Sequence, residues 1–324
     1  MLTWYVYGSG RGFRAEMIER PRNPREKPFG QRGDAMKRRE FLGRAAVGLG
    51  AAWLGAKTLA AVAVEAPPAQ FNATDVVPLG RTGIQTTRLA CGTGTIGFAH
   101  HSNQSALGIQ GLADLLWAGY DNGLRFIDTA DSYGTHPHVA AALKRLPREK
   151  MTILTKSGAR NAAGMQADLD RLRLELGTEY IDILLMHAVT ESDWPNRFKA
   201  AMDVLSEARE KGIIRAHGVS CHSLRALRAA AQSPWVQVDL VRLNPIGAHM
   251  DADPATVLSV LWEMRAAGKG IVGMKILGQG DMRHRVDEAL KHAFSTKVLD
   301  AFTIGAESRA EQADLIRRIA AVRV

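Results

Sequence analysis

The stretch RFIDTADSYG, Arg125 to Gly134, joins an apolar run typical of a buried strand to a polar turn that ends in a tyrosine. The run carries Asp128 near its end, and Tyr133 follows five residues later. Two runs of the same kind come next in the chain, MTILTK ending at Lys156 and IDILLMH ending at His187. An aspartate and a lysine inside apolar strands are costly unless they are paired. The pattern therefore predicts that Asp128 and Lys156 lie together.

Strand-like and helix-like segments alternate from Thr86 onward. The apolar, β-branched runs lie at 86–92, 125–130, 151–156, 181–187, 213–219, 236–243, 271–276 and 298–304. Helical patterns separate them, with apolar residues at spacings of three and four: Leu169, Leu172 and Leu176 in one, and Phe198, Met202, Leu205 and Ala208 in another. Pro195 suits a helix start, Gly212 a helix end, and a last helix is expected at 309–319. Alternating strands and helices imply parallel βαβ units. Eight such units in about 240 residues predict an α/β fold, a closed (β/α)8 TIM barrel.

The barrel prediction gives the polar groups a common location. Active sites of such barrels lie at the C-terminal ends of the strands, where Asp128, Lys156 and His187 fall, with Tyr133 in the loop after the second strand. A tyrosine has a pKa of about 10. A nearby ammonium would lower that pKa, and an aspartate would hold the ammonium in place. We therefore expect Tyr133 to protonate a carbonyl oxygen that His187 orients; the alternative is a purely structural salt bridge.

Several motifs together resemble the aldo-keto reductase family. The segment from Ile127 to Gly134 is similar to the family's ID-T-A-x-x-Y-G signature, and Lys156 and His187 match its lysine and histidine motifs. The likeness continues at Pro78–Gly83, Leu176–Asp182, Gly218–Ser220 and Ile304–Ser308. The resemblance implies NAD(P)H-dependent reduction of an aldehyde or ketone to an alcohol, with a small carbonyl compound as substrate. It also implies the catalytic residues: Asp128, Tyr133, Lys156 and His187.

The resemblance assigns further residues to the cofactor. It places the nicotinamide at Ser220 and Arg242, and the phosphates at the loops after the seventh and eighth strands, with Lys275, Gly278, Gly280, Gly305, Ser308 and Arg309. Cys221 and Arg242 stand where the family has an asparagine and a glutamine, and Pro245 stands near the position of an aromatic residue. A guanidinium donates hydrogen bonds but cannot accept one from the carboxamide. We expect NADPH, bound through Arg309, with NADH as the alternative because Glu307 would repel a 2′-phosphate.

The composition narrows the class of protein. The chain has 324 residues and a net charge of +9, but residues 1–66 carry 12 Lys/Arg against 6 Asp/Glu, and the remainder is nearly balanced, 30 against 27. The predicted barrel therefore lacks the basic face that nucleic-acid binding requires. The two cysteines, Cys91 and Cys221, form neither a disulfide framework nor a zinc motif. The pairs His100-His101 and His136-Pro-His138 are expected in loops around the substrate mouth, and no metal site is expected.

The N-terminal segment resembles an export signal. MKRREFL, Met36 to Leu42, has the twin-arginine (Tat) pattern, and a short apolar run rich in Ala and Gly follows. We expect residues 36–66 to be a Tat signal peptide read by the export machinery, translation to start at Met36 with 1–35 disordered or artefactual, and 67–324 to be a periplasmic barrel. At 12 residues the apolar run is too short for a stable membrane span. The alternative is a basic amphipathic helix or an uncleaved anchor.

A second function class stays open. A nicotinamide enzyme in the periplasm would have to bind its cofactor before export, and the residues expected at the nicotinamide differ from the family pattern. The alternative is therefore an exported barrel that binds a ligand or partner without redox turnover. Retention of all four proton-transfer residues favours the enzyme.

Overall fold

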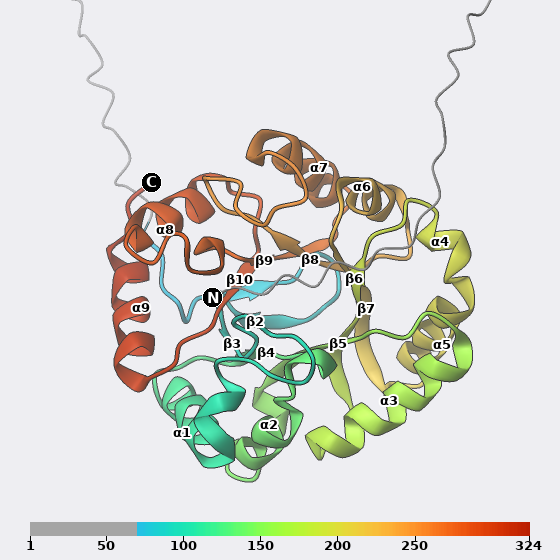
Figure 1. Cartoon of the computed structure of the whole chain (residues 1–324), viewed down its shortest axis with the longest axis horizontal. Coiled ribbons are helices and arrows are strands. Elements are labelled where there is room, and N and C mark those ends of the chain that lie inside the picture. Colours follow the sequence, from blue (N-terminus) through green and yellow to red (C-terminus); the bar gives the residue numbers. More distant parts are fainter. Residues whose placement is uncertain (1–69) are drawn as a thin grey trace, which may run out of the picture. The chain divides into compact units, whose positions relative to one another are not determined.

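The strands of the barrel form one closed ring. The computed structural model describes residues 70–324, in which eight parallel strands close in the order β10-β3-β4-β5-β6-β7-β8-β9 (Figure 1). They are β3 (Leu89–Gly92), β4 (Phe126–Asp128), β5 (Thr152–Ser157), β6 (Ile181–Val189), β7 (Ile214–Cys221), β8 (Val238–Arg242), β9 (Gly270–Met274) and β10 (Ala301–Ile304). The predicted (β/α)8 TIM barrel is confirmed, and each predicted run overlaps one of these strands.

Helices form the outer layer of the barrel (Figure 1). They are α1 (Gly108–Asp121), α2 (His136–Leu143), α3 (Ala162–Leu176), α4 (Trp194–Arg197), α5 (Lys199–Glu210), α6 (Leu224–Gln232), α7 (Pro254–Ala266), α8 (Val286–Ser295) and α9 (Arg309–Ala321). Short 3-10 turns are η1 (Ser105–Leu107), η2 (Asp131–Tyr133), η3 (Arg148–Lys150) and η4 (Gly278–Gly280). One apolar cluster fills the space between strands and helices, and a second fills the barrel interior.

Helix α3 illustrates how the local sequence sets an element. Leu169, Leu172 and Leu176 are buried at the predicted spacing. Asn161 caps the first turn by accepting from the backbone N–H of Gly164, which satisfies one of the free donors there. The helix ends at Gly177, whose φ of +62° is the left-handed conformation that glycine adopts without strain. The apolar face therefore lies against the barrel with both helix ends fixed.

The first predicted strand was partly wrong. Residues 86–87 belong to a separate hairpin, β1 (Val76–Pro78) with β2 (Gln85–Thr87), and the barrel strand begins only at Leu89. The hairpin residues Leu79 and Ile84 join the interior apolar cluster. The Gly80 N–H donates to Asp300, which precedes β10. The hairpin therefore packs at the N-terminal end of the barrel, opposite the strand ends that carry the expected site.

The expected helix around Pro195 is two helices. Pro195 lies in the first turn of the four-residue α4, and α5 begins separately at Lys199. The buried residues Met202, Leu205 and Ala208 confirm the predicted apolar face of α5. Gly212 follows that helix with a φ of +72°. The last predicted helix, 309–319, is confirmed as α9.

The expected signal peptide at 36–66 and the expected leader at 1–35 lie outside the described residues. In residues 70–324, no helix is both long enough and apolar enough to cross a membrane.

Candidate active site

The four residues expected to carry the chemistry meet at the C-terminal end of the barrel. Asp128 ends β4, Lys156 lies in β5, and Tyr133 lies in η2. The Lys156 ammonium donates to Asp128 Oδ1 at 2.5 Å, to the carbonyl of Thr129 at 2.8 Å and to Tyr133 Oη at 3.3 Å. The Tyr133 and His187 rings meet edge to face, with centroids 5.9 Å apart. The predicted pairing of Asp128 with Lys156 is therefore found.

Burial dominates the electrostatics of the tyrosine. It raises the pKa of Tyr133 above its usual 10.0, while the Lys156 ammonium opposes that rise and Asp128 adds to it. The Lys156 ammonium therefore acts in the expected direction, but loss of solvent outweighs it and the net shift of the Tyr133 pKa is upward. Burial also disfavours the Lys156 ammonium, but Asp128 and Tyr133 together raise the pKa of Lys156. Lys156 therefore stays charged at neutral pH.

His187 is held neutral. Burial lowers its pKa to about 3, and the cations Lys156, Arg160 and Lys275, with His222, act in the same direction. A neutral imidazole has one N–H donor and one acceptor nitrogen. It can therefore donate to a carbonyl oxygen near Tyr133 without adding charge to the site.

The β3–α1 loop forms a close wall against the tyrosine. A Cβ added at Gly94 would lie within 3.0 Å of three atoms of the Tyr133 ring, and one at Gly97 would also meet that ring. Only glycine fits at these two positions without moving the phenol. Sequence reasoning passed over both glycines because the pattern alone did not place this loop over Tyr133.

The expected nicotinamide end differs from the sequence interpretation in one respect. Cys221 lies in the apolar layer between strands and helices, so its thiol does not replace an amide at the mouth. Ser220 Oγ and Arg242 Nε are buried and have no hydrogen-bond partner among residues 70–324. Arg242 instead forms an ion pair with Asp251, a residue that no sequence signal indicated. The unsatisfied Ser220 and Arg242 atoms are available to a polar ligand group once side chains rearrange.

His222 is a second residue that the sequence interpretation did not assign to the site. It follows β7, and its ring meets that of His187 edge to face, with centroids 6.2 Å apart. Burial lowers the pKa of His222 to about 4, and Arg242, Lys275 and Lys156 act in the same direction. Both histidines at the mouth are therefore neutral near pH 7.

The expected phosphate residues lie on two neighbouring loops, after β9 and after β10. Lys275 and Gly278 have left-handed backbones, and a Cβ at Gly280 would meet nothing within 4 Å. Gly305 is different, because a Cβ there would collide with Thr95 and Gln104. The space at Gly280 leaves the loop after β9 open to a ligand. The need for glycine at Gly305 is explained by its packing against the β3–α1 loop.

Ser308 and Arg309 begin the last helix. The hydroxyl of Ser308 caps α9 by accepting from the Glu311 N–H at 3.2 Å. The Glu307 carboxylate accepts from Asn103 Nδ2 at 2.6 Å. Arg309 is exposed and, within residues 70–324, forms no ion pair. Of these three side chains, Arg309 is the one left free for an anion.

The histidines expected as a loop pair are in fact part of a helix. His136 and His138 lie in the first turn of α2, where Pro137 suits a helix start, and both are buried. His136 bonds Glu175 at 2.9 Å and Thr155 Oγ1 at 2.8 Å, so both ring nitrogens are used. The prediction that this pair rims the mouth is wrong. His100 and His101 do lie in an exposed loop.

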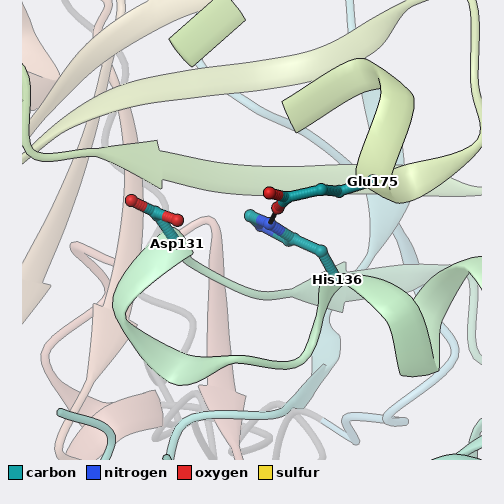
Figure 2. A group of neighbouring side chains, drawn as sticks. All are labelled: Asp131, His136 and Glu175. Atoms are coloured by element: carbon teal, nitrogen blue, oxygen red, sulfur yellow. Dashed lines mark hydrogen bonds and ion pairs between the residues drawn. The ribbon is translucent and has the colours of Figure 1, made fainter. Parts of the chain in front are cut away.

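Figure 2 shows Asp131, His136 and Glu175 converging from η2, α2 and α3. Their possible metal-ligating atoms lie within 4.8 Å of one another. Arg171 donates to Asp131 at 2.9 Å and to Glu175 at 2.7 Å, so a guanidinium already bridges the two carboxylates. We interpret this cluster as an ion-pair network that ties α3 to η2, the turn that carries Tyr133.

Comparison with known proteins places this site in a family. The model of the aldo/keto reductase family matches residues 88–322, which contain all the expected site residues. The chain belongs to the aldo/keto reductase family. Solved structures agree in fold: an aldo-keto reductase of Bacillus halodurans in its holo form has a TM-score of 0.64 at 15% identity, covering 78% of this chain and 92% of that one. A Pseudomonas aeruginosa protein assigned to the aldo-keto reductases gives 0.64 at 23%, covering 77% and 97%.

Curated relatives match over shorter stretches. An aldo-keto reductase of Mycobacterium avium is 35% identical over 115 residues, 32% of this chain and 37% of the relative. A D-threo-aldose 1-dehydrogenase of a Pseudomonas species is 25% identical over 199 residues, 51% and 59%. An NADH-specific methylglyoxal reductase of Escherichia coli is 30% identical over 167 residues, 44% and 51%. The chain thus spans between 37% and 59% of the length of these three relatives.

Proposed function

We propose that this aldo/keto reductase family member reduces an aldehyde or ketone to an alcohol with a nicotinamide cofactor. The observation that carries the proposal is the contact of one buried ammonium, Lys156, with both Asp128 and Tyr133 Oη. A structural salt bridge would need only Asp128. The phenol adds a group that can deliver a proton, placed beside a neutral histidine at the mouth of the barrel.

In the proposed reaction Tyr133 donates its proton to the carbonyl oxygen as negative charge develops there. Lys156 stabilises the phenolate left behind, and Asp128 holds Lys156 in position and balances its charge. His187 donates a hydrogen bond to the same oxygen and so orients the carbonyl. A bound nicotinamide cofactor supplies the hydride. Burial of Tyr133 makes the phenolate costly, so the Lys156 contact is the main compensation available within the site.

The described residues fit such a cofactor. Ser220 and Arg242 offer buried polar atoms that no group in the described part of the chain contacts through a hydrogen bond. Lys275 offers a cation, and Gly280 leaves room for a phosphate to approach the backbone. We propose NADPH as the preferred form, because Arg309 is free while the Glu307 carboxylate is already bonded to Asn103. Because one relative is named as NADH-specific, NADH is the alternative cofactor that the binding experiment must compare with NADPH.

We also propose export through the Tat route to the periplasm. The support is the paired arginines Arg38 and Arg39 before a short, weakly apolar run. That route carries folded proteins, so the barrel would fold and bind its cofactor before export.

Tyr133→Phe tests the proposed chemistry. The change removes one hydroxyl and keeps the ring, so NADPH should bind as before, measured by fluorescence titration. Turnover of a small aromatic aldehyde should fall by about 10²–10⁴-fold, the usual contribution of general acid catalysis. Near-normal turnover in the variant would exclude Tyr133 as the proton donor. NADPH binding without turnover in the unmutated protein would favour a binding protein instead.

A further inference from the structure

Two half-buried cations at the barrel mouth, Arg160 and Lys275, form no ion pair with a carboxylate within residues 70–324. Arg160 and Lys275 are half-buried, and burial lowers the pKa of each. Two further cations of the mouth are paired: Lys156 with Asp128, and Arg242 with Asp251. An unpaired cation that has lost part of its solvent is costly. A bound anion would remove that cost.

Arg160 is the cation that the proposed cofactor site leaves unused. It lies in the loop after β5, whereas Lys275 follows β9. In the closed ring β5 and β9 are four strands apart in either direction, so the two loops face each other across the mouth (Figure 1). The proposed phosphate loops follow β9 and β10. Arg160 therefore lies on the opposite side, next to His187, whose carbonyl oxygen it contacts.

The hydrogen bonds of Arg160 leave part of its guanidinium free. Nη1 donates to the carbonyls of Gly158 at 3.0 Å and Ala159 at 3.1 Å, and Nη2 donates to the carbonyl of His187. A guanidinium has five N–H donors, so Nε–H and one Nη2–H have no partner in the described residues. These two free donors are available to an anion, and a carboxylate is a partner that guanidinium groups bind strongly.

The nearest carboxylate does not neutralise Arg160. Glu191, in the loop after β6, is close enough to favour the Arg160 charge but forms no ion pair with it. Its Oε2 accepts from the Thr190 N–H at 3.1 Å and hydroxyl at 3.3 Å, and its Oε1 lies 3.9 Å from Arg197. The positive charge beside His187 is therefore uncompensated from that side.

We propose that Arg160 binds a carboxylate on the substrate, so that the preferred substrates are oxo acids, in which an aldehyde or ketone and a carboxylate belong to one molecule. This inference rests on the proposed carbonyl reduction. His187 and Tyr133 hold the carbonyl oxygen, and Arg160 holds the anionic end on the β5 side of the mouth. A neutral aldehyde is held only through its carbonyl oxygen, so a negative charge on the substrate raises kcat/KM.

A matched pair of substrates tests the proposal. 4-Formylbenzoate and 4-formylbenzamide have nearly the same size and shape but differ in charge. The unmutated protein should show a kcat/KM about tenfold higher for the benzoate, as expected of a charge-assisted contact. Arg160→Gln should bring the benzoate-to-benzamide ratio of kcat/KM close to one. The kcat/KM for 4-formylbenzamide should stay nearly unchanged. Arg160→Lys should keep part of the ratio, because it retains the charge.

Arg197→Gln is the control. Arg197 lies over the same Phe198 ring as Arg160 but makes no contact with His187, so its loss should leave the ratio as it is. A ratio of one in the unmutated protein, or a preference that survives Arg160→Gln, overturns the proposal. A variant that loses activity equally on both aldehydes also overturns it, because that pattern belongs to a structural brace between β5 and β6.

The two proposals fail in different ways. Reduction of the benzamide by the unmutated protein supports carbonyl reduction whatever Arg160 does. If neither aldehyde is reduced, carbonyl reduction of this kind fails, and the Arg160 inference is then judged by ligand-induced shifts in Tm. Larger stabilisation by 4-formylbenzoate than by 4-formylbenzamide, lost in Arg160→Gln, supports an anion site; equal shifts overturn it.

Discussion

Burial decides the direction of the pKa shift at Tyr133, His187 and His222, whereas at Lys156 the neighbouring Asp128 and Tyr133 outweigh burial. The phenol of Tyr133 keeps a raised pKa although an ammonium lies 3.3 Å from its oxygen. The same loss of solvent holds His187 and His222 neutral. In the proposed reaction Tyr133 therefore starts as a protonated donor, and Lys156 contributes when charge appears on the phenol oxygen.

The pH dependence should reflect the neutral histidines. Burial, with Lys156, His222, Arg160 and Lys275, holds the pKa of His187 at about 3, and that of His222 is about 4. We therefore expect the pH profile of kcat/KM to show no inflection near about pH 6.5, where an ordinary histidine titrates. The measurement is steady-state aldehyde reduction in buffers of constant ionic strength. An inflection there that disappears in His187→Gln would show that His187 titrates normally.

Gly94 is expected to affect catalysis because it packs closely against the Tyr133 ring. In Gly94→Ala the new Cβ would overlap the Tyr133 ring and push the phenol away from Lys156. Misplacement of a reacting group by about 1 Å can cost about 10²-fold in rate, so kcat should fall by about that factor. Gly158→Ala is the control, because a Cβ there meets nothing within 4 Å. Equal turnover for the two variants, with equal Tm, would mean that the ring position does not limit catalysis.

At the scale of elements, the proposed catalytic residues and the proposed cofactor residues come from different strands and loops. Strands β4, β5 and β6 bring Asp128, Lys156 and His187 to one side of the mouth. The loops after β9 and β10 bring Lys275 and Arg309 to the other side. Parallel strands make this possible, because all their C-terminal ends lie at the same end of the barrel.

The start of α9 should decide the choice of cofactor. If Arg309 contacts the 2′-phosphate, NADPH should bind more tightly than NADH. Arg309→Ala should then narrow that preference by about tenfold or more, the usual weight of a charge-assisted contact. Fluorescence titration with both cofactors measures it. Arg317→Ala, an exposed arginine of the same helix paired with Asp314, should change neither affinity. Equal affinities in the unmutated protein would point to Glu307 as a partner of the ribose hydroxyl.

At the scale of the whole molecule, the proposed export depends on residues 36–66, which precede the barrel in the sequence. We expect the mature protein to begin within residues 61–70, where small residues offer cleavage sites. Export should need the paired arginines. N-terminal sequencing of the periplasmic fraction checks the first expectation. An Arg38→Lys/Arg39→Lys variant that reaches the periplasm at the normal level would refute the second.

The sequence by itself determined the fold class and the four residues of the proposed chemistry. Strand-like runs that end in Asp128, Lys156 and His187 are local patterns, and parallel strand ends must meet at one end of a barrel. The buried faces of α3 and α5 could be predicted from the spacing of their apolar residues. Hydrophobic periodicity depends only on residues close together in the chain, so it can be recognised without knowing how the elements pack.

Only the tertiary structure decided the surroundings of those residues. The burial that outweighs Lys156 at Tyr133, the position of Gly94 against the ring and the pairing of Arg242 with Asp251 all join segments far apart in sequence. The same holds for His136, which looked like a loop histidine but fills a gap between α2 and α3. Solvent exclusion and close contact depend on how many elements pack together around a group. No local pattern in the chain contains that information, and it decides which charges at the mouth stay unpaired.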